Sequence, residues 1–590
     1  MAPFLEEVPS AGSEAKATKL AWERINQRGY EILERPYGTH VPKRVIAIGA
    51  GATGICFAQF SKTIPNLDVQ IYEKSDEVSG TWHDNRYPGC ACDIPAHIYQ
   101  FQWAPNPHWS HYYVGAKEIF QYFKDVVDKH DLTKLIKLKH QVIGANWNPS
   151  TAKWIVEVQT PDGAQFTDTC DFLINGCGLL NNWKWPQIKG LHSFKGQLVH
   201  SANYDESIQL KGKKVAVFGA GSSGVQIVAT IQPLVDHLYT WIRSPLWISS
   251  GFASKFAGSN GTNFAYPDEL KARFATEKDA HLRYMKMLDE ELGKRFNFMM
   301  DNTDEARDAV RFARQQMENQ LRSRPELIKK IIPTKYGVGC RRPTPGNGYL
   351  EALLCSNVST YTDEVRMITR DGFIDHEGNE HQVDVIICAT GFDVSYVPRF
   401  PITANGKDLR KVWESDPVAY FGTMVPDFPN YFASLGPYNA ANGSLIPPIE
   451  QGCHYILQII EKCQIERVRS ISPTAQATQE FREHSDLLLK RTVWNQPCRS
   501  WFKNGTVDGL PRIYPGSRAH FMEVMKPRFE DFELQYESDN RFYYLGNGFA
   551  SREFDGRDPT WYLGLINGQD KQPDYSVDEK LVIELCQLDR

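Results

Sequence analysis

Short apolar runs that open directly into glycine-rich turns occur twice in this chain. Residues 44–48 form a β-branched run before a turn at 49–54, and residues 214–218 form a second run before a turn at 219–224. Helix-like sequence follows each turn. Continuous apolar runs of this length are typical of strands that are buried on both faces of a parallel sheet. The pattern predicts an α/β fold with two Rossmann-like dinucleotide-binding domains.

The pattern changes between the second turn and the end of the chain. Residues 267–332 are dominated by Glu, Lys, Arg, Leu, Met and Ala at helical spacing, which predicts a helical insertion. A strand-like run returns at 383–388, and the polar, aromatic-rich tail 515–590 contains a predicted strand at 542–545. We therefore expect the second nucleotide unit to be inserted in the first, with the chain crossing back near residue 380.

These patterns divide the chain into four predicted parts. The amphipathic, mixed-charge stretch 13–35 is interpreted as a surface arm that packs on a domain. The predicted parts are an N-terminal extension at 1–40, the first part of an FAD-binding domain at 41–207, an NADP-binding domain at 208–384 with its helical insertion at about 262–335, and at 385–590 the second part of the FAD-binding domain with the C-terminal region.

Both turns have the spacing G-x-G-x-x-G. The first glycine allows the tight turn, the second lets the backbone approach a pyrophosphate, and the third lets the helix pack closely. The helix N-terminus then offers free N–H groups and its dipole to the diphosphate. The residues with these expected roles are Gly49, Gly51 and Gly54 in the first turn and Gly219, Gly221, Ser222 and Gly224 in the second.

Opposite charges stand at the same offset behind the two turns. Glu73 ends the run 69–72 and can accept hydrogen bonds from both hydroxyls of a ribose, while it would repel a 2′-phosphate. Arg243 ends the run 238–242 and would pair with that phosphate, and Ser244 could add a hydroxyl contact. The alternative is that both are solvated strand ends. The contrast predicts FAD at the first turn and NADPH at the second.

Composition and charge narrow the class of protein. The 590 residues are 42% hydrophobic with a net charge of −5, which indicates a globular protein and argues against nucleic acid or an anionic membrane as partner. The start shows no secretory signal, and no run is apolar enough to span a bilayer, so we expect a cytoplasmic protein without stable membrane insertion. The 12 scattered cysteines favour reduced thiols over a disulfide framework. Cys90 and Cys92 form the one close pair, and without further ligands no metal is expected.

A segment between the two turns carries a family resemblance. Phe194, Gly196, His200 and Tyr204 resemble the F-x-G-x-x-x-H-x-x-x-W motif of Baeyer–Villiger monooxygenases, class B flavoproteins. Tyr204 stands where that family usually has Trp, and the related nitrogen- and sulfur-oxidising flavin monooxygenases carry an aromatic such as Tyr there. Without the family, a lone histidine after a strand is best interpreted as structural.

Further segments resemble the Baeyer–Villiger family rather than its relatives. Residues 80–82, 85–89 and 92–95 look like its flavin-proximal stretch, 339–343 looks like its G-C-[KR]-R-P segment, and 389–393 looks like its A-T-G-[FY]-D motif. The resemblance covers roughly residues 40 to 550. Residues 514–517 and 546–548 look like fungal members that tailor secondary metabolites.

The resemblance implies a reaction and its residues. In the family NADPH reduces FAD, a C4a-peroxyflavin forms with O2, and a ketone becomes an ester or lactone; here we expect a polyketide or terpenoid ketone. Arg342 matches the arginine that stabilises developing negative charge, and Asp93 matches its acidic partner. The other residues to which the resemblance gives a cofactor contact are Thr81, Trp82, Tyr99, His200, Arg341 (beside Arg243 at the 2′-phosphate) and Trp501 on a mobile loop. The oligomeric state stays open.

Three other interpretations compete with this one. A flavin monooxygenase that oxygenates nitrogen or sulfur would share the scaffold and both cofactors; Tyr204 favours it, whereas Asp93 and Arg342 disfavour it. A two-cysteine disulfide reductase needs a C-x-x-C, which the chain lacks. A non-enzymatic nucleotide-binding protein would have a damaged site, but both turns and the Arg342 segment are intact.

Overall fold

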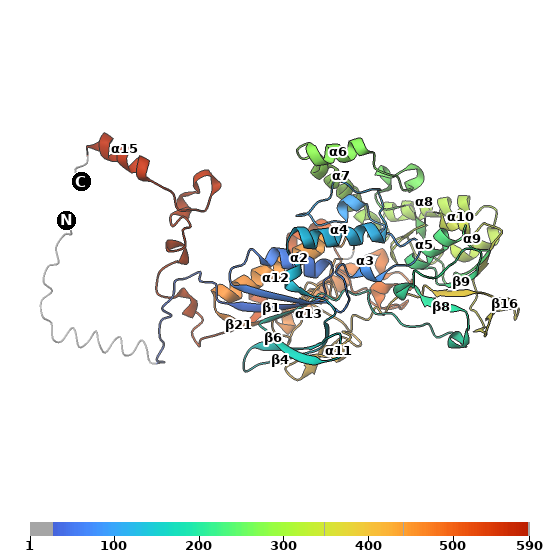
Figure 1. Ribbon diagram of the computed structural model, residues 1–590, viewed down its shortest axis with the longest axis horizontal. Helices are drawn as coiled ribbons and strands as arrows, with labels where there is room; N and C mark the ends of the chain where they lie inside the picture. Colours follow the sequence, from blue (N-terminus) through green and yellow to red (C-terminus); the bar gives the residue numbers. More distant parts are fainter. Residues whose placement is uncertain (1–27, 250, 347, 441, 588–590) are drawn as a thin grey trace. The chain divides into compact units, whose positions relative to one another are not determined.

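The computed structural model describes residues 28–249, 251–346, 348–440 and 442–587 (Figure 1). The chain forms two compact units. The larger contains residues 43–460 and 471–533, and the smaller contains residues 461–470 and 534–590 with the described residues up to 42. Most of the amphipathic stretch predicted at 13–35 lies outside the described residues.

The first sheet of the larger unit is parallel throughout, in the order β20-β7-β1-β2-β3. Its central strand is fully apolar over four residues because both faces are covered. The strands are β1 (Lys43–Ile48), β2 (Leu67–Tyr72), β3 (Ile136–Lys137), β7 (Phe172–Asn175) and β20 (Tyr431–Ala433). Helices α2 (Ala52–Ser61), α4 (Ala116–Lys129) and α12 (Ile446–Ile465) belong to the same part of the unit (Figure 1).

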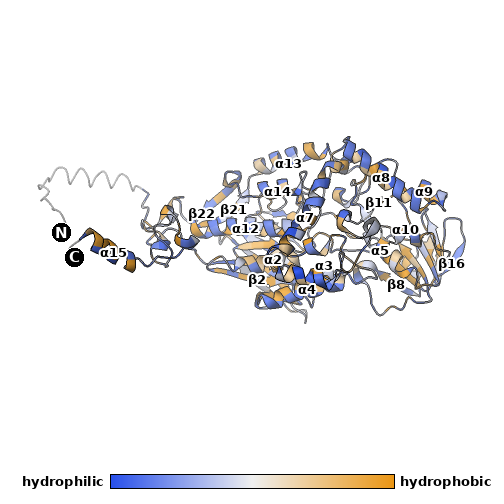
Figure 2. Cartoon of the chain, turned by 90° about the horizontal axis from the view of Figure 1, so that it is seen from above, coloured by the Kyte–Doolittle hydropathy of each residue, from blue (hydrophilic) through white to orange (hydrophobic). Residues whose placement is uncertain are grey.

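The second sheet repeats this architecture in the order β13-β10-β9-β17-β8, again with parallel pairs. Helices α5 (Ser222–Ile231) and α10 (Tyr349–Ala352) pack against each other beside it. The strands are β8 (Gln197–His200), β9 (Lys214–Phe218), β10 (His237–Trp241), β13 (Val358–Tyr361) and β17 (Val385–Cys388). Hydrophobic residues concentrate in these strands (Figure 2).

The order of the strands shows how the two sheets are connected. The chain completes the second sheet with β17 and then returns to the first sheet at β20. The predicted fold class, two Rossmann-like domains with the second inserted in the first, is confirmed. The exact domain boundaries stay a prediction; β8 is a strand of the second sheet although it precedes residue 207.

A third sheet, mainly antiparallel, has the order β19-β18-β4-β5-β6. In β5 buried residues alternate with more exposed ones, as expected for a strand with one covered face. Its strands are β4 (Gln141–Asn148), β5 (Lys153–Gln159), β6 (Gln165–Cys170), β18 (Ile402–Ala404) and β19 (Lys407–Asp408). The small sheets contain β11 (Ile248–Ser249), β12 (Thr344–Pro345), β14 (Met367–Ile368), β15 (Gly372–Ile374), β16 (Glu380–Gln382), β21 (Val468–Pro473) and β22 (Phe532–Tyr536).

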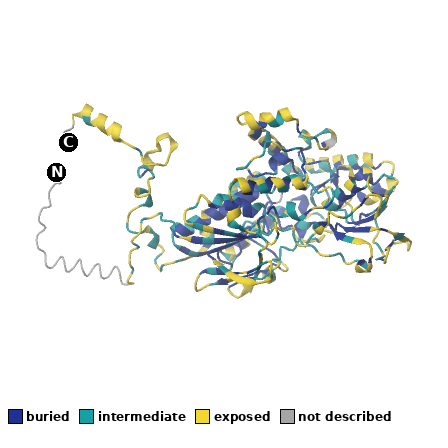
Figure 3. Ribbon diagram, viewed as in Figure 1, coloured by how far each residue is buried: buried dark blue, intermediate teal, exposed yellow. Residues whose placement is uncertain are grey.

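Four helices lie between residues 268 and 331, the part of the chain where a helical insertion is expected. Thr303 caps α8 by accepting a hydrogen bond from the Ala306 N–H at 3.1 Å, and Pro325 occupies the first turn of α9, where its missing N–H costs nothing. The insertion helices are α6 (Asp268–Thr276), α7 (Ala280–Lys294), α8 (Asp304–Gln320) and α9 (Pro325–Ile331). Much of α6 is exposed (Figure 3). The remaining α-helices are α3 (Thr81–Asp84), α11 (Leu409–Val412), α13 (Ala475–Leu489), α14 (Arg518–Val524) and α15 (Ser576–Cys586).

In the smaller unit the N-terminal arm pairs with the C-terminal region. The Tyr37 N–H donates to the Phe549 carbonyl at 2.7 Å, and the Ser551 N–H donates to the Tyr37 carbonyl at 2.8 Å. The strand predicted at 542–545 is wrong, because residues 543–545 form a 3-10 turn. Their N–H groups are satisfied locally, since Tyr543 N–H donates to the Asn540 carbonyl and turn-forming residues flank the aromatic run.

The cysteines depart from expectation at two positions. Cys340 and Cys498 form a disulfide, with their Cα atoms 6.2 Å apart. The expectation of reduced thiols is wrong for this pair, because the fold brings together residues whose spacing in the sequence carries no signal. The other ten cysteines are free thiols. Within the described residues no cluster of His, Cys, Asp and Glu could hold a metal ion, and no helix is both long and apolar enough to cross a bilayer.

Candidate active site

The first glycine turn has the geometry of a diphosphate cradle. Gly49 adopts φ +101°, and a Cβ on Gly54 would lie 2.2 Å from the Gly49 carbonyl oxygen, so no larger residue fits there. Helix α2 begins directly afterwards, with Gly51 as its N-cap and no side chain capping it. The N–H groups of this first turn are therefore directed at whatever lies in front of the helix.

Glu73 is buried at the end of β2 and its carboxylate is held on both oxygens. Oε2 accepts a hydrogen bond from the Ala50 N–H and Oε1 accepts one from the Ser75 N–H, each at 2.8 Å. The first bond ties the carboxylate to the glycine turn itself. The geometry positions an acidic group beside the cradle, as a ribose-binding residue requires.

A cavity of about 650 Å³ opens in front of this turn. Two of its lining residues, Ser79 and Asn439, each carry a buried side-chain oxygen that has no hydrogen-bond partner within the described protein. A cavity of this size with unpaired polar atoms fits a large polar cofactor such as FAD. The predicted cofactor-binding residues that line it are Gly49, Gly51, Glu73, Thr81, Trp82, Tyr99 and Trp501.

The second glycine turn repeats the geometry of the first in a more open setting. Gly219 adopts φ +118°, and a Cβ on Gly224 would lie 1.9 Å from the Gly219 carbonyl oxygen. Helix α5 begins at Ser222, and the space beside Gly221 is open. This turn can therefore also accept a diphosphate, although it does not border the 650 Å³ cavity.

Arg243 follows β10 and is largely exposed. Its side chain is 64% exposed and reaches only Glu364, which is itself exposed, at 3.9 Å. Arg341 approaches the same strand end, because it neighbours Tyr336, whose hydroxyl donates to the Pro245 carbonyl. Burial raises the pKa of Tyr336, and the charge of Arg341 acts in the opposite direction. Arg341 thus interacts with a tyrosine that contacts the chain two residues after Arg243, which is compatible with a shared 2′-phosphate site.

Asp93 and Arg342 form a forked ion pair. Arg342 donates to the two carboxylate oxygens at 2.7 and 3.2 Å, and its guanidinium lies 5.0 Å from the centre of the Phe252 ring. Burial alone would lower the pKa of Arg342, but the charge and hydrogen bonds of Asp93 outweigh it and leave the pKa raised. Arg342 is therefore a fixed, permanently charged group.

His200 is the last residue of β8, and its ring packs between Trp183 and Thr390. Its ring is buried, stacks on Trp183 at 4.6 Å, and lies 3.2 Å from the Thr390 hydroxyl, while Nδ1 accepts from the Ala202 N–H. Burial lowers the pKa of His200 to about 4, so the ring is neutral at physiological pH. Trp183 and the buried Tyr204 line the cavity, whereas His200, which stacks on Trp183, does not.

Trp501 reaches the cavity from a short 3-10 turn (Trp501–Lys503). Its neighbour Phe502 is buried in a hydrophobic cluster with Met299 and Trp494, and Trp501 packs against the same cluster. Phe502 thus anchors the turn in the core, and Trp501, the residue before it, lies at the cavity.

Comparisons with known proteins agree with this geometry. The chain matches the family described as flavin-binding monooxygenase-like over residues 42–258. It is 39% identical to the FAD-binding monooxygenase tazF of Aspergillus terreus, covering 93% of this chain and 99% of the relative. The chain belongs to the flavin-binding monooxygenase-like family. A Baeyer–Villiger monooxygenase of Streptomyces coelicolor is 30% identical, over 82% of this chain and 90% of the relative.

Solved structures of this family have the same fold. Cyclohexanone monooxygenase from Rhodococcus sp. Phi1 bound to NADP+ superimposes with a TM-score of 0.72 at 26% identity, over 84% of this chain and all of that one. The predicted resemblance is confirmed. At the level of the family, the expected enzyme class, an FAD- and NADPH-dependent monooxygenase of the Baeyer–Villiger type, is confirmed as well.

Sequence reasoning missed several residues around the cavity of this flavin-binding monooxygenase. Arg399 and Asn439 contribute polar groups to it, and α12 contributes apolar ones. Phe252 beneath Arg342 was also missed. None belongs to a short motif, and only the return of the chain to the first sheet brings Arg399, Asn439 and α12 to the cavity.

Proposed function

We propose that this monooxygenase carries out Baeyer–Villiger oxidation, inserting one oxygen atom next to a ketone carbonyl to give an ester or lactone. The balance is ketone, O2, NADPH and a proton to ester, water and NADP+. The observation that carries the proposal is the forked Asp93–Arg342 pair, with O···N distances of 2.7 and 3.2 Å.

Arg342 would stabilise the negative charge that develops on oxygen during the insertion. A fixed cation is effective there because it is already oriented when the charge appears. Asp93 holds one edge of the guanidinium through two hydrogen bonds and keeps it protonated, and the Phe252 ring supports its face. The side chains of Arg342 and Asp93 are 27% and 20% exposed, and these partly buried surroundings strengthen each of these interactions relative to water.

The two glycine turns would hold the two cofactors. FAD fits the first turn, with Glu73 on its ribose and Thr81, Trp82 and Tyr99 along the cavity, and when reduced it supplies the oxygen-activating chemistry. The flavin route described for the resembling family is part of this proposal. NADPH fits the second turn, with Arg243, Ser244 and Arg341 on its 2′-phosphate.

The substrate would be a ketone, and O2 the second substrate. Solved structures of cyclohexanone monooxygenase have been obtained with cyclohexanone and with ε-caprolactone bound, and tazF is a fungal relative. On that basis, and because of the helical insertion, we propose a larger polyketide or terpenoid ketone for this chain. We further propose that the protein works in the cytoplasm.

Oxygen-dependent consumption of NADPH tests the proposal. Purified protein should be yellow and should oxidise NADPH faster with some members of a panel of ketones, amines and sulfides. We expect the accelerating compounds to be ketones, with products one oxygen atom heavier that are esters or lactones. Exclusive formation of N-oxides or sulfoxides would instead select heteroatom oxygenation, which Tyr204 at the motif's last position favours.

A further inference from the structure

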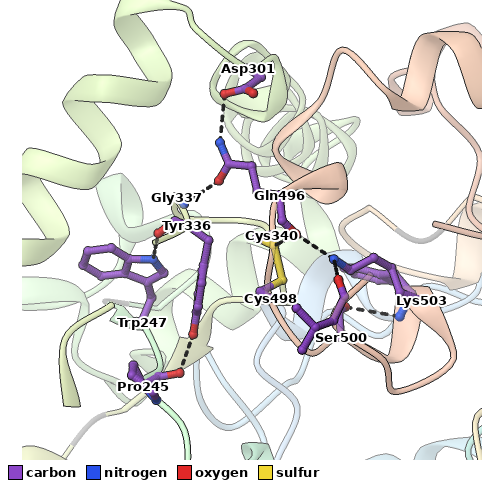
Figure 4. The surroundings of a disulfide bond; sticks show 12 residues. Pro245, Trp247, Asp301, Tyr336, Gly337, Cys340, Gln496, Cys498, Ser500 and Lys503 are labelled. Carbon is purple, nitrogen blue, oxygen red and sulfur yellow. Dashed lines mark hydrogen bonds between the residues drawn. A yellow bond between two sulfur atoms is a disulfide. The ribbon is translucent and has the colours of Figure 1, made fainter. Parts of the chain in front are cut away.

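The disulfide joins two segments that the proposed function uses. Figure 4 shows the bond between Cys340 and Cys498. Cys340 directly precedes Arg341 and Arg342, and Cys498 lies three residues before Trp501. The bond thus links the segment with the fixed cation to the turn that presents an aromatic side chain to the cofactor cavity. These segments are far apart in the sequence, so local chain stiffness cannot relate their positions.

The residues just before Cys340 also make non-covalent contacts with the segment that precedes Cys498. The Gly337 N–H donates to Gln496 Oε1 at 2.6 Å, and Gln496 Nε2 donates to Asp301 at 2.8 Å (Figure 4). A Cβ on Gly339 would lie 2.6 Å from the Met299 sulfur and 3.1 Å from a methyl group of Val493. The segment therefore packs tightly on the residues just before Cys498, and the disulfide closes this contact.

Lys503 closes the Trp501 turn from its other end. The side chain is 1% exposed, and its ammonium group donates to the carbonyls of Gln496 at 2.6 Å and Val507 at 2.7 Å (Figure 4). Asn504 and Gly505 adopt positive φ angles of 52° and 69°, which suit an Asn-Gly turn. Because the buried Lys503 ammonium group donates to two backbone carbonyls, it fixes the conformation of this loop.

We infer that the Cys340–Cys498 disulfide, together with Lys503, positions Trp501 relative to Arg341 and Arg342, and that its reduction weakens productive binding of NADPH. The inference rests on the proposed function, in which Arg341 holds the 2′-phosphate of NADPH, and on the cofactor contact that the family resemblance gives to Trp501. Cutting the bond leaves the loop held only by hydrogen bonds and packing, so it samples more positions. Small displacements of a positioning group can cost a large part of its effect.

The reduction has a simple balance. A dithiol reagent transfers two electrons and two protons, the Cys340–Cys498 sulfur–sulfur bond breaks into two thiols, and the reagent becomes its own disulfide. Within the described residues no other disulfide exists that the reagent could cleave. Any effect that the reagent has and that reoxidation reverses can therefore be assigned to this bond.

The test begins with protein purified without reductant. Peptide mapping under non-reducing conditions should find Cys340 joined to Cys498. Titration with NADP+, in the absence of ketone, should then show roughly tenfold weaker binding after dithiol treatment and full recovery after reoxidation. The KM for NADPH should rise by a similar factor, with a smaller change in kcat. Free thiols at both positions, or equal NADP+ affinity before and after reduction, would overturn the inference.

Variants separate positioning from folding. The Cys340→Ser/Cys498→Ser double variant should bind NADP+ as weakly as reduced protein and should no longer respond to the dithiol. Cys355→Ser, at a half-buried free cysteine between α10 and β13, should behave as the parent does. FAD content and thermal unfolding show whether the double variant is folded, and the reduction experiment on the parent does not depend on it.

A separate variant tests the role of Lys503 in this loop. Lys503→Met keeps the apolar stem and removes the two hydrogen bonds, so NADP+ binding should weaken while the disulfide still forms; Arg499→Met, at an exposed position, is the matched control. Unchanged NADP+ affinity in a folded Lys503→Met protein would remove Lys503 from the inference. Because NADP+ binding needs no ketone, a failure to form esters would refute the proposed function without touching this result.

Discussion

The two glycine turns share one backbone geometry but differ in what surrounds them. The first faces a cavity of about 650 Å³, and the carboxylate behind it, Glu73, is buried and hydrogen-bonded on both oxygens. The second lies outside this cavity, and the cation behind it, Arg243, is 64% exposed. A site inside a cavity suits a cofactor that stays bound through many turnovers, and a more exposed site suits one that must exchange. The same sequence motif therefore suits a cofactor that stays bound or one that exchanges, depending on the residues that the rest of the fold places around the turn.

The largest effect is expected at the Asp93–Arg342 pair. Arg342→Ala should lower ester formation by about 10²- to 10³-fold, because a preorganised charge-stabilising group is lost, while FAD still binds. Product analysis by mass measures this. Arg341→Ala, one residue away, should keep the chemistry and weaken NADPH binding instead. Full ester formation by Arg342→Ala would remove Arg342 from its role.

Glu73→Gln tests the first site, at which we propose that FAD binds. The amide keeps the shape but loses the charge, and one of the two backbone N–H groups of Ala50 and Ser75 loses its acceptor. An unsatisfied buried donor costs about 1–3 kcal/mol, so FAD affinity should fall roughly tenfold or more. The ratio of flavin to protein absorbance after gel filtration measures this. Asp76→Asn, nearby and exposed, should retain FAD, and an unchanged ratio in Glu73→Gln would contradict the assignment.

Arg243→Ala tests the open site with a smaller expected effect. Loss of one exposed charge-assisted contact should raise the KM for NADPH about tenfold and leave that for NADH nearly unchanged. Steady-state kinetics with both nucleotides measures the preference. If the parent enzyme uses both equally, Arg243 has no role in selection, and if the preference survives in Arg243→Ala, Arg341 is the dominant contact.

For His200 the expected effect is on the pH dependence of stability and not on the reaction. Burial lowers its pKa to about 4 in the folded protein, against 6.5 for an ordinary histidine, so below pH 6.5 the unfolded chain binds a proton that the folded one does not. Its contribution is complete above pH 6.5 and is lost as the pH falls to 4, by at most about 3 kcal/mol. Thermal unfolding between these pH values should be less pH-dependent in His200→Gln than in the parent. The exposed His111→Gln should match the parent, and equal slopes in all three would refute the account.

Local sequence was enough to predict the parts of the fold that repeat. The runs before Gly49 and Gly219 became β1 and β9, and the charged helical pattern became α6 to α9. The strand expected at 542–545 failed, because an aromatic run there satisfies its N–H groups in a local turn. Aromatic composition alone does not separate a strand from a turn when turn-forming residues flank it.

The candidate site was predictable only where its residues lie in motifs. Asp93 and Arg342 are 249 residues apart yet form the expected pair, because each sits in its own recognisable segment. Asn439 and Arg399 at the cavity and Phe252 at Arg342 lie in no such segment, and only the tertiary structure brings them there. The Cys340–Cys498 bond was missed for the same reason, since scattered spacing carries no information about pairing.

Transfer of isotopically labelled oxygen from O2 to a ketone tests the central claim most directly. Purified yellow protein would be incubated with NADPH, labelled O2 and the ketone that best accelerates NADPH oxidation, and the product analysed by fragmentation mass spectrometry. The account predicts an ester or lactone with one labelled atom between the carbonyl carbon and its former neighbour. A labelled N-oxide or sulfoxide as the sole product, or NADPH oxidation that yields only hydrogen peroxide with every ketone tested, would contradict it.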